Sequence, residues 1–132
     1  MARKNSERST KVIYPELGYR VQGAIFKVYK TLGPFHKEGV YQRALAQEFE
    51  NKGLGFEREK SISVKYEGKV VGTYRPDFVV EGKILIEIKA LKSVPRPVEK
   101  QLFYYLAGTK YKLGLLVNFG QSGRVYIKRW VS

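Results

Sequence analysis

The feature that most constrains the fold is the run Ile84-Leu85-Ile86-Glu87-Ile88-Lys89 in a chain of 132 residues. A strand this rich in β-branched and apolar residues is typical of a sheet that is covered on both faces. Two charged residues, Glu87 and Lys89, nevertheless lie at its end. A charge in a buried strand is costly unless it is paired or binds a metal ion. We therefore expect this strand both to pack in the core and to hold functional side chains.

The segments on either side of this strand indicate a mixed α/β chain. Apolar residues recur at helical spacing in three stretches, and Gly33-Pro34 ends the first of them. Alternating polar and apolar residues mark half-buried strands, and Glu67-Gly68-Lys69 is expected to form the turn between the first two. We expect helices at about 16–32, 38–51 and 98–110, and strands at 61–66, 70–71, 74–80, 84–90, 113–118 and 124–131. This order predicts one α/β sandwich around a mixed sheet.

The charge of the chain indicates its partner. There are 25 Lys and Arg residues against 12 Asp and Glu, which gives a formal net charge of +13. A field of this sign attracts polyanions, and nucleic acid is the one we expect. A ribosome-associated protein, a protein on an anionic membrane surface and a merely soluble basic domain are the alternatives.

The distribution of apolar and basic residues suggests the organisation of the chain. No apolar run reaches the roughly 18 residues that a membrane-spanning helix needs, and the N-terminus has no apolar signal segment. We therefore expect a cytoplasmic protein with no membrane partner. Residues 1–14 are expected to form a basic, flexible arm, and residues 15–132 a single domain.

The composition also limits the chemistry. The chain has no cysteine, which excludes disulfides, thiolate zinc sites and a cysteine nucleophile. Its one histidine, His36, cannot by itself supply a multi-histidine metal site. Metal chemistry would have to rest on carboxylate oxygens, which favour Mg²⁺ or Mn²⁺.

The turn Glu81-Gly82-Lys83 determines which residues face each other across the central hairpin. If the loop has these three residues, Val80 faces Ile84 and Asp77 lies directly opposite Glu87. Residues paired in this way share a face of the sheet, with Cβ atoms about 5 Å apart. A two-residue loop would move Asp77 to the other face, so the chemistry favours the three-residue register.

In that register three charged side chains converge. Glu87 and Lys89 are two residues apart, so their side chains project from the same face of the sheet. The side chain of Asp77, on the preceding strand, projects from that face too. Two carboxylates this close repel each other unless a cation lies between them, and Mg²⁺ binds through one or two carboxylates while keeping several waters. An ion pair buried for structural reasons is the alternative, but it explains one pair and not three converging groups.

The spacing of these residues resembles a known signature. Pro76-Asp77 and Glu87-Ile88-Lys89 are similar to the PD-(D/E)XK motif of the restriction-endonuclease-like superfamily. The resemblance implies an α-β-β-β-α-β core with a mixed sheet flanked by helices. It also implies a metal-dependent nuclease that hydrolyses phosphodiester bonds in nucleic acid, here expected to be DNA. Asp77 and Glu87 would hold Mg²⁺, and Lys89 would orient water or stabilise the transition state.

A second resemblance lies in the third expected helix. Gln101-Leu102-Phe103-Tyr104-Tyr105 resembles the Q-x-x-x-Y element of RecB-like nucleases, and a spacing of four places Gln101 and Tyr105 on one helix face. The resemblance implies that these two residues support the substrate or the site. An ordinary amphipathic helix with an exposed Gln is the alternative.

A third resemblance precedes the second expected helix. The stretch 32–41 is similar to the motif of the GxxExxY family, in which Glu38 and Tyr41 match and Phe35 stands in place of the first Gly. The resemblance implies that Glu38 completes the metal site, although a carboxylate at a helix N-terminus is also favoured by the helix dipole. Some RecB-like enzymes use an upstream histidine as a metal ligand, which makes His36 a candidate ligand; an exposed turn residue is the alternative. We expect Tyr41 to pack between helix and sheet.

Basic residues near the motif are candidates for nucleic-acid contacts. Each is also consistent with an ordinary solvated charge; the four are Arg75, Lys92, Arg96 and Lys100. Three rival functions remain: a nucleic-acid-binding module without catalysis, a Holliday-junction resolvase-like homodimer, and a structural ribosome-associated protein. A homodimer would give a short chain additional surface for its substrate.

Overall fold

The computed structural model describes residues 13–132, so most of the expected basic arm lies outside the described residues. Ile13 and Tyr14, the last two residues of that expected arm, pack against the hydrophobic core. The elements in chain order are α2 (Pro15–Leu32), α3 (Glu38–Asn51), β1 (Phe56–Arg58), β2 (Ile62–Tyr66), β3 (Lys69–Tyr74), β4 (Phe78–Val80), β5 (Ile84–Lys89), α4 (Arg96–Ala107), β6 (Leu113–Asn118) and β7 (Tyr126–Val131).

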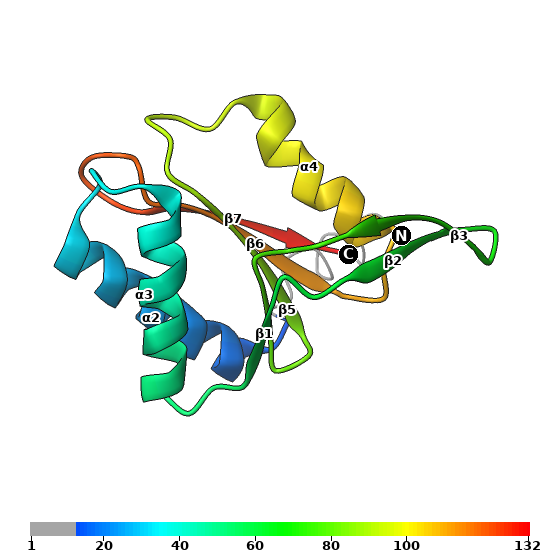
Figure 1. Cartoon of the computed structure of the whole chain (residues 1–132), viewed down its shortest axis with the longest axis horizontal. Coiled ribbons are helices and arrows are strands. Elements are labelled where there is room, and N and C mark those ends of the chain that lie inside the picture. The colour runs from blue at the N-terminus through cyan, green and yellow to red at the C-terminus, as the bar shows by residue number, and fades with distance from the viewer. Residues whose placement is uncertain (1–12) are drawn as a thin grey trace, which may run out of the picture.

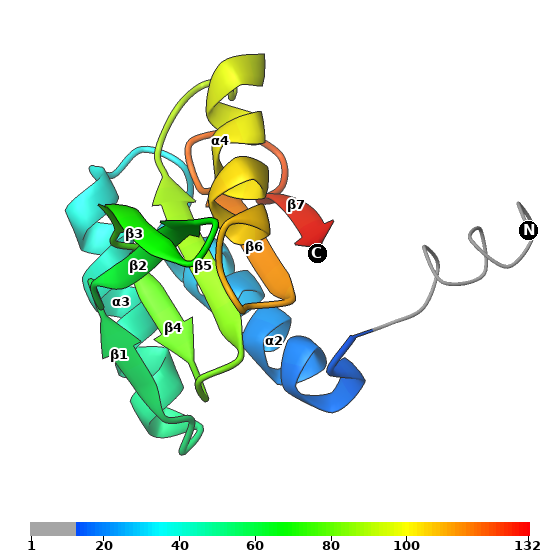
Figure 2. The same cartoon turned by 90° about the vertical axis from the view of Figure 1, so that its right-hand side faces the viewer.

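A five-stranded mixed sheet, in the order β1-β4-β5-β6-β7, forms the centre of the fold (Figure 1). Strands β5 and β6 are parallel and are connected through α4, whereas the other neighbours pair antiparallel. Figure 2 shows β1, β4 and β5 side by side. The mixed sheet flanked by helices is the architecture expected from the sequence.

Apolar side chains cover both faces of β5, as its sequence predicts. Ile84, Ile86 and Ile88 lie in the core that the sheet forms with α2 and α3. Leu85 lies in a second core, on the α4 side of the sheet. Both cores bury their central side chains fully, so the end of β5 that carries Glu87 is held on a rigid frame.

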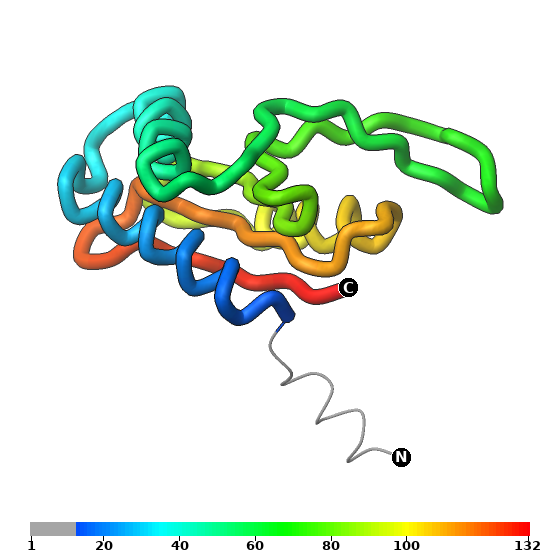
Figure 3. The backbone as a smooth tube through the Cα atoms, turned by 90° about the horizontal axis from the view of Figure 1, so that it is seen from below, coloured from blue at the N-terminus to red at the C-terminus, as the bar shows by residue number. Residues whose placement is uncertain are grey.

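Strands β2 and β3 form a separate two-stranded sheet that extends away from the rest of the fold (Figure 3). Tyr66 pairs with Lys69, so the turn consists of Glu67 and Gly68 alone, both with positive φ. The expected turn was one residue too long, because Lys69 already belongs to β3. Tyr74, at the base of the hairpin, packs into the core on the α4 side.

The continuous strand expected at 74–80 is wrong. β3 ends at Tyr74 and β4 begins at Phe78, and the two strands belong to different sheets. Pro76 lies between them, and a proline has no N–H to donate to a strand ladder. The break leaves Asp77 immediately before β4 and Tyr74 in the hairpin. Strand β1, three residues at the edge of the sheet, was not expected at all.

The register predicted for the central hairpin is confirmed. Val80 pairs with Ile84 and Phe78 pairs with Ile86 across a three-residue turn. Extending this register by one pair places Asp77 opposite Glu87. Within residues 13–132, none of the helices has the length and apolar character required to cross a membrane.

Candidate active site

Asp77 and Glu87 lie next to each other where β4 begins and β5 ends. The backbone N–H of Asp77 donates to Oε1 of Glu87 over 3.3 Å. The N–H of Ile88, the residue after Glu87, donates to Oδ2 of Asp77 over 2.7 Å. The two carboxylates are therefore cross-linked through the backbone, and their positions depend directly on the strand register.

Burial makes both carboxylates hard to ionise. Burial, together with the negative charge of Asp77, raises the pKa of Glu87 to about 7. Burial likewise raises the pKa of Asp77, although the N–H of Ile88 partly opposes it. Among residues 13–132, no basic side chain forms a salt bridge with either group. The pair is thus an acidic site that has no salt-bridge partner among these residues, and a bound cation would stabilise it.

Lys89 supplies a positive charge that acts on this acidic pair. It lies two residues beyond Glu87 on β5, and its side chain is half-buried. Its positive charge lowers the pKa of Asp77, of Glu87 and of Glu38. The ammonium therefore acts on all three carboxylates without forming a salt bridge to any of them.

Tyr74 holds Glu87 from the hairpin. Its hydroxyl donates to Oε2 of Glu87 over 2.9 Å, and its ring stacks on Tyr105 of α4, with centroids 4.1 Å apart. Burial raises the pKa of Tyr74 far above its usual range, so the hydroxyl remains a donor. Tyr74 was not expected here, because in a continuous strand at 74–80 it would face away from Asp77, and the break at Pro76 removes that constraint.

Gln42 connects Glu38 with Asp77. Its side-chain amide donates to Oδ1 of Asp77 over 3.0 Å and to Oε2 of Glu38 over 3.3 Å. Burial, and then the charge of Asp77, raises the pKa of Glu38. Gln42 was not among the expected site residues, although its place four residues after Glu38 indicates that both lie on one helix face.

Asn118 fixes the chain just beyond Lys89. Its side chain is fully buried, accepts from the N–H of Leu91 and donates to the carbonyl of Leu91, both over 2.8 Å. Gly120 packs so closely that a Cβ atom would lie 2.4 Å from the N atom of Leu91. These contacts hold the segment that follows Lys89 against the end of β6.

The family of the chain follows from comparison with known proteins. A family model described as the PD-(D/E)XK nuclease superfamily matches residues 15–130. The chain belongs to this superfamily. No protein with a curated description matches its sequence.

A solved structure has a similar fold. It is the crystal structure of an alkaline exonuclease (LHK-Exo) from Laribacter hongkongensis, with a TM-score of 0.50 and 16% sequence identity. The match covers 92% of this chain and 72% of that one. At this identity the likeness shows the fold alone, and it confirms the restriction-endonuclease-like fold expected from the sequence.

The donor set of this PD-(D/E)XK chain fits a hard divalent cation. Within residues 13–132, no three His, Cys, Asp or Glu side chains come together as a metal-binding group. Asp77 and Glu87 nevertheless offer adjacent, half-buried carboxylates, and a metal such as Mg²⁺ needs only one or two of these beside its waters. Glu38 connects to this pair through Gln42.

The other expected site residues differ in their exposure and contacts. His36 is exposed, and its ring packs edge-on against Tyr41. Tyr41 is fully buried and stacks on Phe119, so its expected packing role is confirmed. The side-chain amide of Gln101 donates to the hydroxyl of Tyr105 over 3.5 Å. The four basic residues expected to contact nucleic acid are all exposed: Arg75, Lys92, Arg96 and Lys100.

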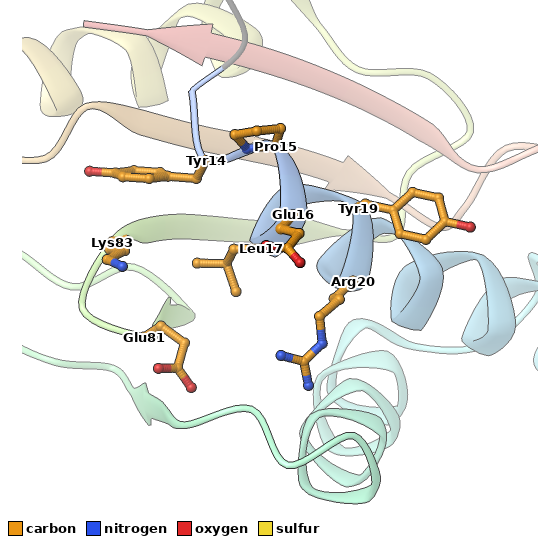
Figure 4. A pocket seen from close by; sticks show the side chains of 8 residues that line it. All are labelled: Tyr14, Pro15, Glu16, Leu17, Tyr19, Arg20, Glu81 and Lys83. Atoms are coloured by element: carbon orange, nitrogen blue, oxygen red, sulfur yellow. The ribbon is translucent and has the colours of Figure 1, made fainter.

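A separate depression lies between the start of α2 and the turn after β4 (Figure 4). Two of its charged side chains, those of Arg20 and Glu81, are bonded to backbone groups. Arg20 donates to the carbonyl of Lys52, and Glu81 accepts from the N–H of Gly55. This turn is at the end of β4 opposite Asp77, so the depression is distinct from the candidate active site.

Proposed function

We propose that this protein is a metal-dependent nuclease that hydrolyses phosphodiester bonds in DNA, with Asp77 and Glu87 holding Mg²⁺ or Mn²⁺. The observation that carries the proposal is the meeting of these two carboxylates with Lys89 on the end of one buried hairpin. Membership of a nuclease superfamily supports the same activity. We also propose that the chain belongs to the GxxExxY group of that superfamily and shares the Q-x-x-x-Y element of RecB-like nucleases.

The carboxylates are arranged to keep their position during the reaction. Glu87 is held by the Tyr74 hydroxyl, and Asp77 by the N–H of Ile88 and the amide of Gln42. A bound divalent ion would supply an activated water and stabilise charge on the phosphate. Groups already oriented before binding need little reorganisation during the reaction, which is where much of the catalytic effect of such sites originates.

Lys89 is suited to act on the substrate. Its positive charge lowers the pKa of Glu87, although no salt bridge joins the two side chains. The ammonium is therefore available to contact a phosphate oxygen or the attacking water. A compact ammonium is a good partner for the charge that develops on a phosphate. Glu38, at the start of α3, would complete the centre through Gln42 and bound water.

The charge of the protein supports nucleic acid as the substrate. The net charge is +13, and exposed Arg75, Lys92, Arg96 and Lys100 lie on the segments next to the site. We propose that these four residues contact backbone phosphates. Each such contact contributes a sequence-independent attraction that weakens with salt.

A cleavage panel tests the proposal. Single-stranded and duplex DNA, a four-way junction and single-stranded RNA are each incubated with Mg²⁺, Mn²⁺ or EDTA. We expect cleavage of DNA with either metal and none in EDTA. A preference for the junction would favour the resolvase alternative. Binding without cleavage under every condition would favour a module that has lost catalysis.

A further inference from the structure

Three consecutive aromatic residues of α4 have three different environments. Phe103 packs on Trp130, with ring centroids 5.1 Å apart. Tyr105 stacks on Tyr74 beside the candidate active site. Tyr104 lies between them in sequence, yet 66% of its surface is exposed, and its ring meets Phe103 edge-on. Core packing therefore explains two of these rings and leaves one face of Tyr104 free for another partner.

Tyr104 is part of a shallow groove on the outer surface of α4. The groove has a volume of about 490 Å³ and is lined by Pro97, Val98, Gln101, Tyr104 and Tyr105. Its walls are mainly apolar or aromatic, with one primary amide. Such a surface suits a flat heterocycle that offers a π-face for stacking and polar atoms along its edge.

The groove adjoins the candidate active site. Tyr105 forms one of its walls and stacks on Tyr74, whose hydroxyl donates to Glu87. Two side-chain contacts therefore connect the groove to the acidic pair. A nucleotide close to the reacting phosphate would place its base within reach of this surface.

Cations flank the groove on the same helix. Lys100 lies four residues before Tyr104, which places both on one helix face, and Arg96 occupies the first turn of α4. Both basic side chains are exposed. An apolar floor with cations at its rim matches the chemistry of a nucleotide, whose base is flat and apolar on its faces and whose phosphates are anionic.

We propose that this groove binds an unpaired nucleobase, stacked on Tyr104, from the strand whose phosphate is cleaved. The inference rests on the proposed nuclease function. Within a duplex, both faces of each base are covered by its neighbours, so a stacking surface of this kind selects single strands, frayed ends or extruded bases. The preferred substrate is then nucleic acid that is single-stranded beside the scissile bond.

Binding in EDTA tests the inference without catalysis. The full chain is titrated by fluorescence anisotropy with oligothymidine, with an abasic oligomer of equal length and charge, and with a blunt duplex. The variants are Tyr104→Ala and Tyr104→Phe, and the control is Tyr19→Ala. Tyr19 is 81% exposed and belongs to α2, which packs on the other face of the sheet from α4.

We expect Tyr104→Ala to weaken binding of oligothymidine by about five- to a hundredfold. Tyr104→Phe and Tyr19→Ala should bind it as the wild type does, and no variant should change binding of the abasic oligomer or the duplex. An equal loss on oligothymidine and on the abasic oligomer, or no loss on oligothymidine, would overturn the inference.

Cleavage measured separately distinguishes this inference from the proposed function. If the wild type cleaves DNA but Tyr104→Ala binds normally, the base-binding groove is wrong and the nuclease stands. If Tyr104 is required for binding of oligothymidine but no metal supports cleavage, the groove is supported and the nuclease is wrong.

Discussion

The hydroxyl of Tyr74 donates to Oε2 of Glu87 over 2.9 Å, and this bond ties the β2–β3 hairpin to the central sheet. The bond favours the charged form of Glu87, because it lowers the pKa of that carboxyl against the effect of burial. The candidate active site therefore depends on a residue that lies outside the signature motif.

Replacing Tyr74 by Phe should raise the pKa of Glu87 further. We expect the acidic limb of the pH–rate profile to move to higher pH and the rate at neutral pH to fall about tenfold, since a hydrogen bond to a charged group is worth roughly 1.5–3 kcal/mol. The stack on Tyr105 should persist, so the melting temperature should change little. A lower melting temperature with an unshifted profile would make the role of Tyr74 purely structural.

Glu87→Gln should change how stability depends on pH. The pKa of Glu87 is about 7 in the folded chain, against an ordinary value of 4.5. Between these values the folded chain binds more protons than the unfolded one, so its free energy of unfolding falls as pH rises. Gln cannot titrate, and the variant should melt at a higher temperature than the wild type at pH 8.

Thermal melts in EDTA from pH 5 to pH 8 measure this difference. As pH rises across that range, the melting temperature of the wild type should fall relative to that of Glu87→Gln. If the plots of melting temperature against pH were parallel for the two proteins, Glu87 would titrate as an ordinary exposed carboxyl.

Lys89→Ala should retain nucleic-acid binding and lose catalytic rate. An interaction made mainly in the transition state lowers kcat and kcat/KM alike, here by about a hundredfold. Lys83→Ala is the matched control, because it removes the same charge from the exposed turn that precedes β5. If Lys89 were only the partner of a buried carboxylate, its removal would instead cost roughly 3–5 kcal/mol of stability. Single-turnover rates and melts on the same sample decide between the two roles.

Arg96→Ala should reduce the salt dependence of DNA binding. Each phosphate contact contributes close to one unit to the slope of log affinity against log salt, so the slope of duplex binding should fall by about one. Lys52→Ala removes a charge from the far end of α3 and should leave the slope unchanged. Equal slopes for all three proteins would place Arg96 away from the nucleic acid.

The hairpin that carries the acidic pair could be predicted from sequence. Strand side chains alternate with a fixed period of two, and a three-residue loop leaves one register in which Asp77 meets Glu87. The observed pairing of Val80 with Ile84 confirms that register. Local spacing was sufficient here because both strands are adjacent in the chain.

The supporting residues could not be predicted in the same way. Tyr74 reaches Glu87 only because the chain changes sheets at Pro76, and Gln42 reaches Asp77 from a helix 35 residues earlier in the chain. In the sequence, Asn118 is only the last residue of an expected strand. Its hydrogen bonds to Leu91 depend on how the end of β6 packs against the segment after β5. Strand β1 is too short to show an alternating pattern.

The central claim, that Asp77 and Glu87 hold the catalytic metal ion, is tested most directly by Mn²⁺ binding and cleavage measured on the same variants. Asp77→Asn and Glu87→Gln remove one charge each and keep the side-chain shape, and Glu50→Gln, on the exposed surface of α3, is the control. Calorimetric titration should show Mn²⁺ binding to the wild type and to the control but not to the two site variants. Cleavage should fall about a thousandfold or more in those two variants alone. Wild-type cleavage that persists in EDTA, or site variants that bind Mn²⁺ and cleave like the control, would contradict the account.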